Sequence, residues 1–174
     1  MDSVRRCWGS LWTDRAIAYR HRNGIPQTSV SLAVVVQRMV PADVAGVLFT
    51  ANPVSGKRSE VVIEASLGLG EAVVSGLVSP DSYVVAKRGL RIVARRVGPK
   101  TVQVVAVRGG GTARVAVEDT TSRSPALADD AITALARLGT AIEEHYGWPQ
   151  DVEWAFAGGK LYVLQSRPIT SLFP

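Results

Sequence analysis

The chain has 174 residues, of which 47% are hydrophobic and 20% charged, and its net charge is +5. This length and composition predict an ordinary soluble globular protein with one domain over residues 1–174. No apolar run approaches the roughly 20 residues that a membrane helix needs, and the N-terminus lacks a signal peptide's apolar core, so we expect a cytoplasmic protein with no membrane partner.

The beginning of the chain predicts a helix and then a strand. The helix is expected from Val4 to about Arg22, because large residues recur at spacings of three and four: Trp8, Leu11, Trp12, Arg15 and Tyr19. An Asn-Gly pair then ends this pattern. Residues 31–40 are mostly apolar and β-branched, which is typical of a buried strand, and Pro41 ends it.

The middle of the chain predicts a series of short strands. Runs rich in β-prone residues, separated by glycine and proline turns, place strands near residues 45–51, 60–65, 82–86, 91–97, 101–107 and 112–117. Gly68 and Gly70 precede a short helix expected to begin at Glu71, and such glycines let backbone N–H groups approach an anion. By itself, a glycine pattern of this kind is a weak signal for a binding site.

Basic residues are concentrated within residues 87–100, namely Lys87, Arg88, Arg91, Arg95, Arg96 and Lys100. Such a patch can contact nucleic acid. We do not expect a nucleic-acid partner, because no recognition motif accompanies the patch and it contains no aromatic residue on which bases could stack. The preferred interpretation is a solvated face, or one that binds a phosphorylated ligand or a neighbouring domain.

The clearest helix signal lies between residues 124 and 147. Ser124 is a capping residue, Pro125 suits the first helical position, and Gly147 suits the end. One apolar stripe runs along this helix: Leu127, Ala131, Leu135, Leu138 and Ile142. Together, the elements predict an α+β fold with a mostly antiparallel sheet and two main helices.

The last stretch, residues 151–168, predicts a hairpin around Gly158 and Gly159. The register of this hairpin matters, because a shift of one residue moves every side chain to the other face. We predict a three-residue turn from Gly158 to Lys160. This turn sends one set of side chains to the core: Val152, Trp154, Phe156, Tyr162 and Leu164.

The same register pairs Glu153 with Gln165 and Asp151 with Arg167 on the opposite face. Carboxylate and amide oxygens beside a guanidinium suit Mg²⁺ and a polyphosphate, since the oxygens hold the metal and the arginine binds phosphate oxygens. The alternative is a cross-strand ion pair at the edge of a sheet, where charges are common. The residue spacing leaves both interpretations open.

Several motifs occur in one order along the chain: CWGSLWT at residues 7–13, VVVQRMV at 34–40, GVLFT at 46–50, NPVSG at 52–56, VIEASLGLGEAVVSG at 62–76, DVEW at 151–154 and LYVLQSRPIT at 161–170. This set resembles the ATP-binding domain shared by phosphoenolpyruvate synthase, pyruvate phosphate dikinase and rifampicin phosphotransferase. The resemblance covers nearly the whole chain and is weakest from about residue 87 to residue 124. It implies the second, C-terminal lobe of an ATP-grasp domain.

The resemblance also implies roles for individual residues. Residues at the hinge between the two lobes would contact adenine, and these are Gln37, Met39 and Val40. Glu71 would contact the ribose or the metal. Glu153 and Gln165 would bind Mg²⁺, Asp151 would support the metal or orient a ligand, and Arg167 would stabilise the transferring phosphate.

We therefore expect the ATP- and Mg²⁺-binding portion of an ATP-dependent phosphotransferase that phosphorylates a mobile histidine. The resemblance implies that the first lobe lies before Met1 and that the swivel and acceptor domains lie after Pro174, or that the first lobe or the swivel domain is on another chain. Neither His21 nor His145 has a Thr-Ser-His-like context, so the histidine that carries the phosphate is expected outside these residues. The alternative is a truncated, non-catalytic remnant that binds nucleotide weakly or serves as an interaction module. The sequence leaves open whether this chain alone is an enzyme, and it does not identify the final acceptor.

Overall fold

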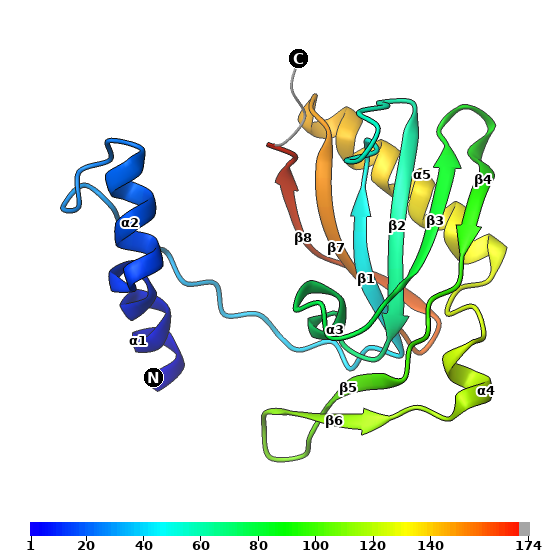
Figure 1. Cartoon of the computed structure of the whole chain (residues 1–174), viewed down its shortest axis with the longest axis horizontal. Helices are drawn as coiled ribbons and strands as arrows, with labels where there is room; N and C mark the ends of the chain where they lie inside the picture. Colours follow the sequence, from blue (N-terminus) through cyan, green and yellow to red (C-terminus); the bar gives the residue numbers. More distant parts are fainter. Residues whose placement is uncertain (171–174) are drawn as a thin grey trace. The chain divides into compact units, whose positions relative to one another are not determined.

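The structure is a computed structural model that describes residues 1–170. Contacts divide the chain into two compact units, Met1–Met39 and Val40–Pro174 (Figure 1). The expectation of one domain over residues 1–174 stays a prediction. In the described part of the chain, no helix is long and apolar enough to cross a membrane.

The first unit is helical, but its predicted single helix is interrupted. It contains α1 (Asp2–Gly9), the 3-10 turn η1 (Ser10–Trp12) and α2 (Asp14–Arg22). Thr13 separates them because its backbone is extended and its carbonyl accepts the first hydrogen bond of α2, from Ile17 N at 3.0 Å. Arg20 is buried and holds the bend together by donating to the carbonyl of Leu11 at 2.6 Å.

The strand predicted for residues 31–40 is wrong. These residues lie in no strand of the described chain, and Val35 and Val36 are 81% and 86% exposed. An apolar, β-branched run becomes a strand only where a second strand pairs with it. The residue types of this segment therefore indicate only a preference for extended backbone. They do not indicate whether the segment is buried or paired with another strand.

The second unit is built on a six-stranded sheet in the order β4-β3-β2-β1-β7-β8, in which all neighbours are antiparallel. Its strands are β1 (Val44–Phe49), β2 (Glu60–Leu67), β3 (Asp81–Ala86), β4 (Arg91–Arg96), β7 (Gln150–Ala157) and β8 (Lys160–Pro168). A separate pair consists of β5 (Val102–Ala106) and β6 (Thr112–Ala116). The remaining elements are α3 (Glu71–Val74), η2 (Arg88–Leu90), α4 (Asp119–Ser122) and α5 (Asp129–Tyr146). The predicted α+β class with a mostly antiparallel sheet is confirmed.

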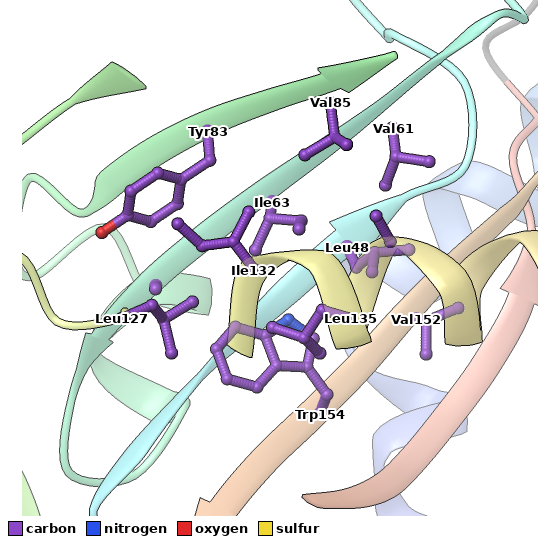
Figure 2. Close-up of a cluster of buried hydrophobic side chains, with 12 residues drawn as sticks. Leu48, Val61, Ile63, Tyr83, Val85, Leu127, Ile132, Leu135, Val152 and Trp154 are labelled. Carbon is purple, nitrogen blue, oxygen red and sulfur yellow. The ribbon is translucent and has the colours of Figure 1, made fainter. Parts of the chain in front are cut away.

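The main core lies between α5 and one face of the sheet (Figures 1 and 2). Leu48, Ile63 and Trp154 from the strands pack against Ile132 and Leu135 from α5, and all five are at most 1% exposed. Burying a large apolar side chain contributes about 1.5–3 kcal/mol, so these contacts dominate the stability of the unit. A smaller cluster lies under α3 and β5: Leu69, Ala72, Val78 and Val104.

Helix α5 begins at Asp129, five residues after the predicted start at Ser124. The residues between them form a loop, in which the backbone N–H of Ala126 donates to Asp81 Oδ2 at 2.7 Å. This hydrogen bond uses an N–H group that a helix starting at Ser124 would have placed in its first turn. The predicted end of the helix at Gly147 is confirmed, with Gly147 in the left-handed conformation at φ 70°.

Several residues of the predicted basic patch form ion pairs within the chain. Lys87 pairs with Glu143 of α5 at 2.6 Å, and Arg95 pairs with Asp129. Lys100 is fully buried and lies 2.6 Å from the equally buried Asp81. These ion pairs therefore connect the sheet to α5 and to the loop before it. The basic residues do not form one continuous solvated surface.

The buried Asp81 carboxylate accepts a complete set of hydrogen bonds. Its donors are Lys100 Nζ, the Gly98 and Ala126 backbone N–H groups and the Tyr83 hydroxyl. Burial, together with the charge of Asp81, raises the pKa of Tyr83 far above its usual range, so this hydroxyl stays protonated and donates. A buried charge is tolerated only when it is paired and hydrogen-bonded in this way.

The loop between β1 and β2 gives a testable prediction on one pKa. The Asn52 side-chain amide, which donates to Glu60 Oε2 at 2.8 Å, and then Lys57 hold the pKa of Glu60 below its usual value. A lowered pKa stabilises the folded state above the unfolded pKa, and this stabilisation is lost as the pH falls through the folded value. We expect Asn52→Ala to raise the Glu60 pKa in a carboxyl NMR titration, more than Lys57→Met does. An unchanged value would contradict the assignment.

Candidate functional site

The side chains that could bind a ligand lie on the face of the sheet opposite α5, which we call the open face. Because neighbouring residues of a strand point to opposite sides, Leu48 and Val152 face α5, whereas Val47, Asp151 and Glu153 face away from it. Helix α3 covers one end of the open face, where Gly70 comes close to Ala45 of β1. Figure 1 shows α3 and α5 on opposite sides of the sheet.

A row of side chains crosses four strands of the open face. Val47 of β1 is paired with Glu64 of β2 on one side and with Glu153 of β7 on the other, and Glu153 is paired with Gln165 of β8. We call these four residues the glutamate row. Both glutamates are half-buried, and within residues 1–170 neither they nor Gln165 make a side-chain hydrogen bond or an ion pair.

The neighbouring row brings together Asp151 and Arg167, as the sequence predicts. Arg167 Nε and Nη2 lie 2.9 Å and 2.8 Å from Asp151 Oδ2. The Asp151 side chain is largely buried, whereas 65% of the Arg167 side chain is exposed. Asp151 Oδ1 is buried without a hydrogen-bond partner in the described chain, and an orphaned carboxylate oxygen of this kind fits a site that a cation or another donor completes.

The predicted pairing of Glu153 with Gln165 is confirmed, but the predicted turn is wrong. Ala157 is paired with Lys160, so the turn has two residues, Gly158 and Gly159, at φ 55° and 75°. Two consecutive positive φ values are what a tight type I′ hairpin turn needs. The register shifts at a β-bulge between Trp154 and Glu153, and this shift places Gln165 opposite Glu153.

Because of the bulge, the residues of β8 that face the core differ from those predicted. Before the bulge, Leu161 and Val163 share the face of Phe156 and Trp154, and Tyr162 lies opposite Ala155 on the open face. Leu164 is the additional residue of the bulge and is only half-buried. The predictions that Tyr162 and Leu164 belong to the core are therefore wrong, because they assumed one uninterrupted alternation along the strand.

The other predicted contacts are placed as follows. Gln37 and Met39 belong to the first unit, and Val40 begins the second. Glu71 is the first residue of α3, is exposed, and accepts a hydrogen bond at Oε2 from Thr112 Oγ1 at 3.3 Å. Contacts of these four residues with a nucleotide stay predictions.

The chemistry of the open face suits Mg²⁺ only in combination with a ligand. Within residues 1–170, no group of three or more His, Cys, Asp or Glu side chains is placed to hold a metal ion. Mg²⁺ is commonly held by one or two protein carboxylates together with substrate phosphates and water, rather than by a complete protein cage. Glu153 and Gln165 offer such a partial set of hard oxygen ligands next to a cation, Arg167.

The family model described as "Pyruvate phosphate dikinase, AMP/ATP-binding domain" matches residues 1–173. The chain belongs to this family. The members of the glutamate row and the Asp151–Arg167 pair thus lie within an AMP/ATP-binding domain.

Relatives of this AMP/ATP-binding domain include phosphoenolpyruvate synthases and rifampicin phosphotransferases. A probable phosphoenolpyruvate synthase of Pyrococcus abyssi is 48% identical over 99% of this chain and 22% of its own length. Rifampicin phosphotransferases of a Streptomyces species and of Bacillus subtilis are 48% and 43% identical over 98% and 100% of this chain, in each case 20% of their own length. The chain therefore spans about a fifth of the length of these relatives.

The sequence did not single out Glu64 as a site residue. It lies in the middle of an apolar run, where a lone glutamate is typical of the exposed side of a strand. Its relation to Glu153 depends on β1 pairing with both β2 and β7, and β7 is about a hundred residues further along the chain. The alternation in residues 60–67 could have placed Glu64 opposite the core, but not next to the hairpin.

Proposed function

We propose that the open face binds ATP as its Mg²⁺ complex and that the chain is the nucleotide-binding portion of an ATP-dependent phosphotransferase. The enzyme would be similar to phosphoenolpyruvate synthase or to rifampicin phosphotransferase, and it would pass a phosphoryl group to a mobile histidine. The observation that carries this proposal is the pair Glu153 and Gln165, which lie side by side, have no side-chain partner among residues 1–170, and lie next to Arg167. Membership in an AMP/ATP-binding family supports it.

Each residue of the proposed site has a distinct task. Glu153 and the Gln165 amide oxygen would hold Mg²⁺, which supplies neutralisation of the phosphate charge when bound. Asp151 binds two nitrogens of Arg167 through a single oxygen, so it fixes the guanidinium plane and leaves Nη1 available for a phosphate oxygen. Alignment and charge neutralisation are the main contributions that a protein makes to phosphoryl transfer.

Four further residues have proposed roles that rest on the resemblance alone. Gln37, Met39 and Val40 would contact adenine, and Glu71 would approach the nucleotide from α3. The phosphorylated histidine is expected outside these residues. His145 lies near the end of α5, behind the sheet relative to the open face, and contacts the ring of Tyr146 edge-on.

The decisive experiment is a titration of the 174-residue chain with ATP in the presence and absence of Mg²⁺, by calorimetry or NMR. We expect saturable, Mg²⁺-dependent binding, weakened by at least about tenfold in Glu153→Gln because a charged metal ligand is lost. Glu144→Gln, on α5, is the matched control and should leave the affinity unchanged.

Two outcomes would contradict the proposed function. The first is the absence of binding at millimolar ATP, which would instead favour a non-catalytic interaction module. The second is an equal loss of affinity in Glu153→Gln and in Glu144→Gln, which would place the nucleotide away from the open face.

A further inference from the structure

Glu64 is the one polar member of the glutamate row to which the proposed metal site gives no role. It lies on β2, two strands from Glu153, with Val47 between them. It is half-buried and makes no side-chain hydrogen bond or ion pair within the described residues. A carboxylate that is partly withdrawn from water and lacks a partner is costly unless a ligand completes its hydrogen bonds.

A second buried polar atom lies on the same side of β2. Ser66 follows Glu64 by two residues, so both point towards the open face, and Ser66 is 1% exposed. Its hydroxyl oxygen has no hydrogen-bond partner in the described chain. Most buried polar groups are hydrogen-bonded, so this part of the open face has unused hydrogen-bonding capacity independent of the metal site.

The environment of Glu64 fits a neutral hydroxyl donor better than a second metal ion. Its neighbours in the sheet are Val47 on β1 and Ser82 on β3, and neither offers a second carboxylate. Within residues 1–170, no acidic group of three is placed for a metal. A carboxylate has acceptor sites for two hydrogen bonds at once, which matches two adjacent hydroxyl groups.

The spacing of the strands decides which hydroxyl groups can reach Glu64. Neighbouring strands lie about 4.8 Å apart, so the Cα atoms of Glu64 and Glu153 are separated by roughly 10 Å across the sheet. A triphosphate chain whose outer phosphates are bound at Glu153, Gln165 and Arg167 extends over a comparable length before it reaches the sugar. The sugar would then lie over Val47 with its hydroxyl groups towards Glu64.

We infer that Glu64 accepts hydrogen bonds from the ribose hydroxyl groups of the bound nucleotide and so selects ribonucleotides over deoxyribonucleotides. This inference rests on the proposed function. The ribose then contacts Glu64 rather than Glu71, because Glu71 is exposed and one of its oxygens already accepts a hydrogen bond from Thr112.

The test compares the affinities of the 174-residue chain for ATP and 2′-deoxy-ATP, both with Mg²⁺. A hydrogen bond to a charged group contributes enough for about a tenfold preference for ATP in the wild-type chain. In Glu64→Ala this ratio should fall to about one, because ATP loses its hydrogen bonds from both hydroxyl groups whereas 2′-deoxy-ATP, which keeps only the 3′-hydroxyl, loses one and is weakened less. Glu64→Gln, which keeps the shape of the side chain, should give an intermediate ratio and guards against a folding defect.

The possible results separate this inference from the proposed function. An unchanged ratio in both Glu64 variants would overturn the role of Glu64, and so would loss of the preference in Glu71→Ala alone. Mg²⁺-dependent binding of both nucleotides would then still support the site at Glu153. If the wild-type chain binds neither nucleotide, the proposed function fails and the ribose contact fails with it.

Discussion

Replacing Lys100 with methionine is expected to lower the free energy of unfolding of the second unit by about 3–5 kcal/mol. Lys100 and Asp81 are both fully buried, with 2.6 Å between Lys100 Nζ and Asp81 Oδ1. Methionine fills a similar volume but leaves the Asp81 charge in the protein interior without a counter-charge. The backbone donors at Gly98 and Ala126 remain, yet hydrogen bonds from neutral groups do not replace the lost ammonium.

The measurement is urea unfolding of the chain followed by circular dichroism, with Lys57→Met as the matched control. Lys57 forms an ion pair with Glu60 at 3.1 Å, but its side chain is 62% exposed, so its removal should cost less than about 1 kcal/mol. The double substitution Asp81→Asn with Lys100→Met removes both charges and should recover part of the loss. Equal losses in the two single lysine variants would show that burial of the Lys100 pair does not matter for stability.

Lys100 also illustrates what the sequence could not predict. It occurs among five other basic residues, and its burial depends on Asp81, nineteen positions earlier, being brought to the same point by β3. Charge alone indicates neither a solvent-exposed nor a buried location. The strands themselves were predictable, because alternating β-prone runs between glycine and proline turns are a local signal.

The hairpin shows a correct pairing obtained with a wrong turn. Glu153 and Gln165 can share a face with a three-residue turn, or with a two-residue turn followed by a bulge, and both paths move the register by one residue. The sequence contains no marker for the bulge at Leu164, whereas the Gly158-Gly159 pair favours the tight turn. The pairing of Glu153 with Gln165 was therefore predictable, while the side-chain assignment nearer to the turn was not.

Replacing Gly46 with alanine is expected to lower the free energy of unfolding by about 3 kcal/mol or more. Gly46 lies in the middle of β1, between Ala65 of β2 and Trp154 of β7. A Cβ atom at this position would overlap the backbone carbonyl oxygen of Glu64 and would lie 3.0 Å from Trp154 Cζ2. A backbone oxygen in a central strand cannot move aside as the end of a flexible side chain can.

The same substitution should also disturb the open face, because relief of the overlap requires β1 and β2 to separate next to Val47 and Glu64. We expect the affinity for Mg·ATP to fall along with stability, under conditions where the variant is still folded. Gly56→Ala is the control: Gly56 has φ 74° and no neighbour within 4 Å of an added Cβ, so it should lose only about 1–2 kcal/mol through backbone strain. A Gly46→Ala chain as stable as the Gly56→Ala chain would mean that β1 and β2 lie further apart, and the distance from Glu64 to Glu153 that the ribose contact requires would then be lost.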